Sequence, residues 1–511
     1  MFVIGILAAI TANAQWKKDS IIKYVSIGQK DISLKYPEDV MSFYTGNQYK
    51  CAWINKNENL QQLERLFKKV PELGFREDDY PISFTRSLLD GSFKLQSGTD
   101  SLLAEIRITD GAMHFLHDAA YGNSPPVLGY NGLDYKPGCF NIPGLLVNAL
   151  NENTLHDVLQ QLEPASAGYI SLKRLLSLLN QRLQNRPVPE TRVSSAEVSR
   201  NNTLLIARLY QLGIIDIPEF EFSDKELLEK VKAAQQLFNL QNDGQLHPAT
   251  LDAMNVSLPA RIEALKSALN TVRWLHCMSQ YPHIIVINIP SASLLVYASD
   301  QVIIQSKVIV GKRSTHTPTL ASRITDVILY PYWVVPKKIS TRELLPLIKH
   351  NSSYLEDNNL QVLDLNGLVV NPANINWQKL DAAYFPYELR QSTGCDNSLG
   401  IIKFNFNSPY GVYLHDTPMK NLFSANKRYF SHGCIRVEKA IDLAHLLLID
   451  KSAEMDAVIE KGCLLNQSPV FMPVSEKMPV FVLYNTAWFD SLANVQFNGD
   501  IYQKLGKAVI K

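Results

Sequence analysis

The sequence has no large excess of charge of either sign and no long hydrophobic run beyond its N-terminus. Its 511 residues contain 50 Lys and Arg against 49 Asp and Glu, a formal net charge of +1. Nothing in this balance favours nucleic-acid binding, and no block of like charges marks an interaction tail. No apolar stretch of 18 residues follows residue 14, so the sequence predicts no transmembrane helix there.

Cysteine is sparse, and its spacing argues against several common sites. No C-x-x-C pair is present, which disfavours a zinc site or a thioredoxin-like motif. If one cysteine is a free nucleophile, the other five cannot all pair within the chain. We therefore expect mostly buried free thiols rather than a disulfide framework, with Cys395 as a thiol that could compete for oxidation. The six cysteines are Cys51, Cys139, Cys277, Cys395, Cys434 and Cys463.

Residues 1–14 have the features of a secretory signal peptide. The run FVIGILAAITANA has the length of an apolar h-region and ends in Ala12-Asn13-Ala14, an A-x-A cleavage site. No Lys or Arg precedes it, so either the positive segment is weak or the true start lies upstream. We expect cleavage before Gln15 and an exported, periplasmic or cell-wall protein. The alternative is an uncleaved N-terminal anchor, which would be the chain's one membrane contact.

The first half of the chain predicts a helical region. A chain of 511 residues is too long for one core, so several domains are expected. Apolar residues recur at helical spacing in 59–73, 154–162 and 170–183, and a loop rich in Gly, Pro and Asn occupies 121–144. We assign 15–200 to one mainly helical region on this basis.

The second half predicts a change from helix to sheet. Residues 201–256 read as a compact unit of short helices and 257–282 as a linker helix. Apolar runs from residue 283 onward are rich in β-branched residues and predict strands up to 465, with a helical, polar insertion at 340–390. A closing strand and tail are expected in 466–511. The predicted fold class is multidomain α+β.

The stretch Tyr413 to Val437, YLHDTPMKNLFSANKRYFSHGCIRV, carries the chemistry. His415 lies 19 residues before Cys434, and His432 lies 2 residues before it. A thiol attacks an acyl carbon as the thiolate, which needs a neighbouring base or cation to lower a pKa of about 8.5. The pattern predicts a strand ending at His415 and a helix directly after Cys434. We therefore expect Cys434 on a turn at a helix N-terminus, where the dipole favours a thiolate, with Gly433 allowing close backbone approach.

This stretch resembles the signature of the L,D-transpeptidases. A histidine is followed by 15 residues, then Ser431-His432-Gly433-Cys434, an aliphatic residue and Arg436. YLHDTP together with SHGCIRV is similar to the large, multidomain YcbB-type branch. The resemblance implies a YkuD-type catalytic domain that builds 3-3 cross-links in peptidoglycan. It also implies that Cys434 is the nucleophile and His415 the general base, with Tyr413, His432 and Gly433 lining the acyl site.

Other segments resemble the same branch. The region 15–200 is similar in order and length to its scaffold domain. The insertion at 340–390 resembles a capping subdomain that covers the catalytic groove, although Ser392-Thr393-Gly394 stands where the branch usually has Pro-Gly, which puts the rigidity of that loop in doubt. Residues 201–256 resemble a three-helix peptidoglycan-binding module, with a plain helical connector as the alternative. The matching residues are Leu209, Leu212, Gly213, Gln235, Phe238, Asp243, Gly244, Thr250 and Leu251.

The resemblance implies a reaction between two peptidoglycan stem peptides and no cofactor or metal. A tetrapeptide donor would acylate Cys434 with release of D-Ala, and a side-chain amine of an acceptor stem would resolve the thioester. Backbone N–H groups around residues 431–434, with Ser431 and Tyr413, are candidates to hold the oxyanion or the substrate. Arg436 either steadies a substrate carboxylate or pairs within the fold. His415 is oriented either by Asp416 or by a backbone carbonyl. The resemblance further implies acylation by carbapenem inhibitors.

Three alternatives remain at this point. Water or a free D-amino acid in place of the amine would make the same site an L,D-carboxypeptidase or an exchange enzyme. A wall-binding scaffold with an unused thiol is a second option. A papain-like peptidase is a poor third, because there the cysteine precedes the histidine by over a hundred residues.

Overall fold

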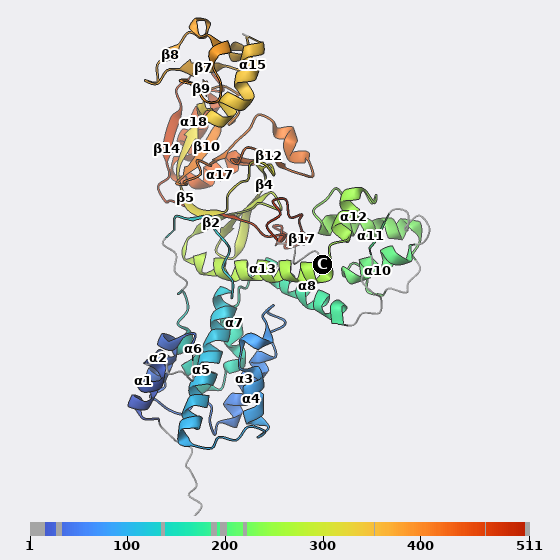
Figure 1. Ribbon diagram of the computed structural model, residues 1–511, viewed down its shortest axis with the longest axis vertical. Coiled ribbons are helices and arrows are strands. Elements are labelled where there is room, and N and C mark those ends of the chain that lie inside the picture. Colours follow the sequence, from blue (N-terminus) through green and yellow to red (C-terminus); the bar gives the residue numbers. More distant parts are fainter. Residues whose placement is uncertain are drawn as a thin grey trace, which may run out of the picture.

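The computed structural model describes residues 16–26, 33–133, 138–184, 192–194, 202–217, 222–351, 353–464 and 467–505. The expected signal peptide, 1–14, lies outside these residues. The described chain is elongated, with a helical bundle at one end, the insertion at the other and the main sheet between them (Figure 1). None of the described helices combines the length and the apolar character that a bilayer-spanning segment needs. The multidomain α+β class is confirmed.

The N-terminal bundle is built around α5 (Gly98–Tyr121), a helix of 24 residues with 15 of them buried. The Ser97 side chain accepts a hydrogen bond from the Asp100 backbone N–H and caps its start. The helix ends at Gly122, whose φ of +78° favours glycine. Shorter helices pack around it: α1 (Lys18–Ser26), α2 (Pro37–Gly46), α3 (Asn57–Phe67), α4 (Ile82–Leu89), α6 (Ile142–Glu152) and α7 (Val158–Leu162).

The expected linker helix is present as α13 (Leu258–His276), which crosses the middle of the molecule (Figure 1). It contacts α5 of the bundle, α8 (Ala167–Gln184) and the hairpin of β16 (Ala487–Phe489) and β17 (Val495–Phe497). The Arg273 side chain, fully buried on α13, donates from Nε to the Tyr169 hydroxyl at 3.0 Å and from Nη2 to the Leu73 carbonyl at 2.8 Å. One helix thus joins the bundle to the rest of the chain.

The unit expected at 201–256 contains α10 (Thr203–Gln211), α11 (Asp224–Leu237) and α12 (Pro248–Met254). The predicted Asp243-Gly244 turn lies between α11 and α12. The buried Gln235 side chain holds it, donating to Asp243 Oδ1 at 2.9 Å and accepting from the Gly244 N–H at 2.7 Å.

The main sheet closes on itself. Its strands follow the order β5–β10–β11–β13–β4–β3–β2–β15, and β15 pairs back onto β5. Helices α17 (Ala440–Leu447) and α18 (Ser452–Glu460) contact β10 and β5. The strands are β2 (His283–Asn288), β3 (Ser293–Ala298), β4 (Gln301–Gly311), β5 (Leu320–Leu329), β10 (Ile402–Phe406), β11 (Leu414–His415), β13 (Ile435–Val437) and β15 (Pro479–Leu483), with β1 (Tyr130–Asn131), β12 (Tyr429–Ser431) and β14 (Val470–Pro473) attached to their edges.

Three of these strands come from segments that the sequence assigned elsewhere. The loop at 121–144 supplies β1, which pairs in parallel with β5. The tail at 466–511 supplies β14 and β15, so it completes the main sheet rather than following it.

The insertion at 340–390 is mixed, and the prediction of a helical insertion was incomplete. Besides α14 (Lys337–Ile339), a π-helical turn at Ser340–Leu344, α15 (Leu345–His350) and α16 (Tyr354–Asp357), it forms most of a second sheet of order β6–β9–β7–β8. Its strands span only two to four residues, too few to show an alternating pattern. They are β6 (Trp333–Val334), β7 (Leu360–Leu363), β8 (Val369–Val370) and β9 (Glu388–Gln391), around a hydrophobic cluster of their own.

The expectation of free thiols was wrong for four cysteines. Cys139 bonds Cys277 across 138 residues, and Cys395 bonds Cys463 across 68 residues. Sequence spacing could not show this, because pairing depends on which Cα atoms approach to about 4.4–6.8 Å in the fold. Cys51 and Cys434 remain free.

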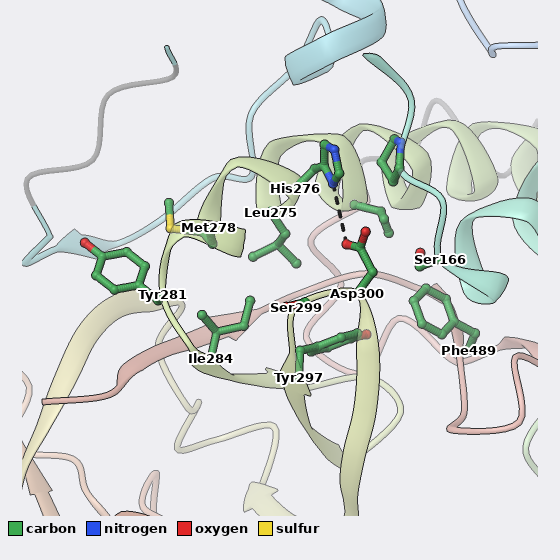
Figure 2. A pocket seen from close by; sticks show the side chains of 12 residues that line it. Ser166, Leu275, His276, Met278, Tyr281, Ile284, Tyr297, Ser299, Asp300 and Phe489 are labelled. Carbon is green, nitrogen blue, oxygen red and sulfur yellow. Dashed lines mark ion pairs between the residues drawn. The ribbon is translucent and has the colours of Figure 1, made fainter. Parts of the chain in front are cut away.

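A small cavity lies where α13 meets the β2–β3 hairpin, with a volume of about 30 Å³ (Figure 2). The ring of His276 faces the Asp300 carboxylate, 3.5 Å from Nδ1 to Oδ1, and the Tyr297 and Phe489 rings lie on the opposite side. That volume holds about one water molecule. No residue from Tyr413 to Val437 lines it, so the candidate chemistry lies elsewhere.

Candidate active site

Two adjacent strands bring the candidate residues to one face of the sheet. β11 and β13 pair in parallel, with Leu414 opposite Ile435 and His415 opposite Arg436. Side chains alternate between faces along a strand. Leu414 and Ile435 are fully buried in the core, so the other face carries Tyr413, His415, Cys434 and Arg436. The predicted strand end at His415 is confirmed.

The expected helix N-terminus at Cys434 is wrong. Strand β13 follows the cysteine directly, paired with β11 on one side and β4 on the other, and α17 begins only at Ala440. The apolar spacing that predicts the helix starts after Val437. A helix dipole therefore does not act on this thiol.

The Cys434 sulfur lies against Tyr413. It accepts hydrogen bonds from the backbone N–H and the hydroxyl of Tyr413. Burial raises the pKa of the Cys434 thiol, while these hydrogen bonds and the positive charges of Lys403 and Arg436 oppose that rise. Because burial is the largest of these effects, the resting group is a neutral thiol.

His415 is buried, with 5% of its surface exposed, and a backbone carbonyl orients it. Nδ1 lies 2.6 Å from the Asp416 carbonyl oxygen, and the Leu399 backbone also accepts from the ring. Burial lowers the pKa of His415 to about 3, assisted by the positive charge of Arg436. The Asp416 carboxylate is engaged elsewhere, accepting from the Ile401 N–H at 3.1 Å and pairing with Lys420. Of the two orienting groups considered, the carbonyl is the one in contact.

The loop at 390–400 that holds Leu399 is well connected despite its missing proline. The Asn397 side chain donates to the carbonyls of Ser392 at 2.9 Å and Pro331 at 3.1 Å. Its Oδ1 accepts from the Leu399 N–H at 2.8 Å, and the disulfide of Cys395 anchors the same loop. The rigidity that the sequence put in doubt is supplied by these contacts.

The turn before Cys434 is held from both sides. Gly433 has a φ of +124°, a conformation that other residues rarely adopt. Ser431 Oγ accepts from the Gly433 N–H at 3.1 Å and donates to the Cys434 carbonyl at 2.5 Å, while Thr317 Oγ1 donates to the Gly433 carbonyl at 2.8 Å. Ser431 is 3% exposed, so in this conformation its side chain holds the turn.

His432 points to the insertion. Its Nε2 lies 2.9 Å from Glu343 Oε1 in the π-helical turn, and Lys312 Nζ lies 3.5 Å from the same nitrogen. The insertion therefore touches the turn before Cys434 through this contact.

Sequence reasoning missed three contributors. Lys403 of β10, paired opposite His415, places Nζ 4.3 Å from the centre of the Tyr413 ring. The Trp333 side chain of β6 hydrogen-bonds to the Tyr413 hydroxyl, and Glu343 contacts His432. The one available indication in the sequence was a lysine within the alternating run IKFNF. Only the pairing of β10 with β11 shows that this lysine lies opposite His415.

Arg436 carries an unsatisfied group. Its Nε is buried and has no hydrogen-bond partner among the residues that the structure describes, and burial lowers the pKa of its guanidinium. Over the same described ranges, neither Arg436 nor Lys403 has a carboxylate within 4.0 Å, and no group of three or more His, Cys, Asp and Glu side chains could hold a metal ion.

Comparisons with known proteins bear on each part of the chain. Residues 282–474 match the model of the L,D-transpeptidase catalytic domain (YkuD), residues 38–176 that of a scaffold domain, and residues 203–254 that of a "putative peptidoglycan binding domain". A Haemophilus influenzae protein named "Putative L,D-transpeptidase" is 36% identical over 267 residues, 52% of this chain and 53% of that protein. The chain thus matches about half the length of this curated relative.

Among solved structures, an L,D-transpeptidase from Mycobacterium smegmatis is 14% identical, covers 39% of this chain and 58% of its own, and has a TM-score of 0.18. The match to the catalytic-domain model contains the whole stretch from Tyr413 to Val437 and both strands that position it. The chain therefore carries a YkuD L,D-transpeptidase catalytic domain, preceded by a peptidoglycan-binding domain.

Proposed function

We propose that this protein forms 3-3 cross-links in peptidoglycan by cysteine acyl transfer. The observation that carries the proposal is the arrangement of Tyr413, His415 and Cys434 on one sheet face, with the thiol hydrogen-bonded to Tyr413 and the imidazole neutral. A neutral imidazole beside a neutral thiol favours general-base activation over a preformed ion pair.

The proposed reaction has two acyl transfers. His415 takes the proton of the Cys434 thiol as sulfur attacks the carbonyl between the third stem residue and the terminal D-Ala. The tetrahedral intermediate collapses, the D-Ala amine leaves with the proton from His415, and a thioester remains. The acceptor amine then attacks the thioester, forms the amide and returns its proton through His415 to the sulfur.

The cations of the site suit an anionic substrate. Arg436 and Lys403 lie on the thiol face and lack carboxylate partners among the described residues. Of the two roles considered for Arg436, we therefore favour a contact with a substrate carboxylate. The Tyr413 hydroxyl and the Cys434 N–H are our candidates for the oxyanion, because the Gly433 N–H is already bonded to Ser431.

Two further observations support action on the cell wall. Two disulfides are typical of proteins that mature in an oxidising compartment outside the cytosol, in line with export. The peptidoglycan-binding match at 203–254 and the scaffold match at 38–176 support the proposed assignment of 201–256 as a wall-binding module and 15–200 as a scaffold. Carbapenem acylation of Cys434 remains part of this proposal.

The decisive experiment follows products from disaccharide-tetrapeptides by mass spectrometry. We expect cross-linked dimers from the full chain and none from Cys434→Ala, whose melting temperature should be nearly unchanged because a small side chain is removed. Tripeptide without any dimer would instead identify an L,D-carboxypeptidase. If neither dimer nor tripeptide formed, the result would favour the wall-binding scaffold.

A further inference from the structure

A second hollow, of about 860 Å³, lies between the peptidoglycan-binding module and the catalytic domain. This volume is within the range of about 300–1,000 Å³ that is usual for ligand sites. One wall comes from the end of α11, α12 and the start of α13, and the other from residues 426–429 and 497–501. Figure 1 shows α11 and α12 facing β17 across this region, and α11 and β17 are in contact.

Polar and aromatic contacts hold the two walls in a fixed relation. Asn239 Nδ2 of the module donates to Asn498 Oδ1 at 3.0 Å. The guanidinium of Arg261 lies 4.7 Å from the Phe238 ring centre on the module and 4.5 Å from the Phe497 ring centre on the catalytic side. The hollow is therefore a built feature of both domains.

The lining combines aromatic rings, amides and an excess of positive charge. Two carboxylates line the hollow, Asp252 and Asp500. The Asp500 carboxylate already accepts a hydrogen bond from the Tyr484 hydroxyl at 2.6 Å. The amides and the half-buried Tyr429 ring suit N-acetylated sugars, and the exposed cations suit the carboxylates that such a polymer bears. Three of the four lining cations, Arg192, Arg313 and Lys427, are exposed, whereas Arg261 is buried between the two phenylalanine rings.

Two lining residues of the hollow are close in the chain to the turn before Cys434. Tyr429 lines it and begins β12, which runs directly to Ser431 and then Cys434. Arg313 lines it too and follows Lys312, whose N–H donates to the Ser431 carbonyl at 3.0 Å. Four residues lie between Tyr429 and Cys434, so their Cα atoms are at most about 17 Å apart, and a four-residue stem peptide extends to about 14 Å.

We propose that this hollow binds the glycan strand of peptidoglycan and so presents an attached stem peptide to Cys434. The inference rests on the proposed function, in which Cys434 reacts with a stem peptide. It assigns the substrate's sugar backbone to a composite site that neither domain forms alone.

The test uses the full chain with Lys427→Glu and, on the same side of the hollow, Arg313→Gln. Lys461→Glu is the matched control, an exposed lysine of the catalytic domain outside the hollow. In a Cys434→Ala background, titration calorimetry with peptide-free glycan strands should show about tenfold weaker binding for each hollow variant and no change for the control. In active enzyme, the ratio of kcat/KM for glycan-borne over free tetrapeptide should fall by about tenfold.

Binding that neither hollow variant weakens, or no glycan binding by the Cys434→Ala chain, would overturn the inference. So would equal affinity for a sulfated polysaccharide, which would show an unspecific basic surface. Melting curves establish that each variant is folded. If Lys427→Glu does not fold, Arg313→Gln provides the test. If wild-type enzyme leaves every tetrapeptide unreacted, the proposed function fails, while the calorimetry still tests the hollow separately.

Discussion

At the scale of residues, burial determines the resting protonation state of Cys434 and His415. It raises the pKa of the Cys434 thiol and lowers that of His415 to about 3, so both groups are neutral at ordinary pH. The positive charges of Lys403 and Arg436 lower both pKa values. They therefore add to the effect of burial on the imidazole and oppose it on the thiol. In the proposed mechanism, the neutral imidazole can therefore act as the base, and the thiolate forms only as sulfur attacks.

A pH profile tests this state of His415. The base must be neutral to act, and with a pKa of about 3 it stays neutral as pH falls from 7 towards 4. Acylation of Cys434 by a carbapenem, followed by stopped-flow fluorescence, should therefore show no acid limb near pH 6.5, and His415→Gln should slow it by about 10²–10⁴. His432→Gln is the comparison: if that variant, and not His415→Gln, lost acylation, His432 would be the base.

Tyr413 offers a second test at this scale. Tyr413→Phe removes the hydroxyl that donates to sulfur while leaving the backbone N–H contact. We expect acylation to slow by roughly tenfold, the value of about one hydrogen bond to a charged group. Tyr410→Phe is the matched control, since its hydroxyl donates to the Gly129 carbonyl at 2.7 Å, away from the thiol. Equal rates in the two variants would assign the activation of sulfur to other groups.

At the scale of elements, the insertion contacts the turn before Cys434, and under the proposed function we expect it to limit water at the thioester. It has its own hydrophobic cluster and reaches this turn through Glu343 and His432. Its two ends lie together, because the Val335 N–H donates to the Leu389 carbonyl at 2.9 Å. It can therefore be shortened without separating β6 from β9 or displacing Trp333.

Replacing residues 337–388 with a short Gly/Ser linker should leave Cys434 alkylatable and the donor reactive. Without the cover, water competes with the acceptor amine, so the dimer-to-tripeptide ratio measured by mass spectrometry should fall several-fold. Glu343→Gln, which keeps the insertion and weakens one contact, should lower the ratio less. An unchanged ratio in the shortened enzyme would show that acceptor choice is made elsewhere.

At the scale of the whole molecule, α13 joins two hydrophobic cores, that of the N-terminal bundle and the one it shares with α8 and the β16–β17 hairpin. Its buried Arg273 bonds Tyr169 and the Leu73 carbonyl, and its guanidinium lies 4.5 Å from the Phe75 ring centre. Arg273→Ala leaves these acceptors unpaired, which should lower the free energy of unfolding by roughly 3 kcal/mol. We expect a melting temperature several degrees lower by calorimetry, with Arg174→Ala, an exposed arginine of α8, unchanged. Equal melting of both variants would mean that the junction does not depend on Arg273.

Local sequence patterns determined the order of domains, the helical first half, the strand that ends at His415 and the spacing that singles out Cys434. These features depend on periodicity and on neighbours along the chain, which a sequence displays. The tertiary structure alone decided the disulfides, the β-strands of the insertion and the strand, rather than helix, after Cys434. It also brought Lys403, Trp333 and Glu343 to the site from 31, 101 and 91 residues before Cys434. Such contacts arise from strand pairing and close packing between distant segments, and no local pattern encodes which segments meet.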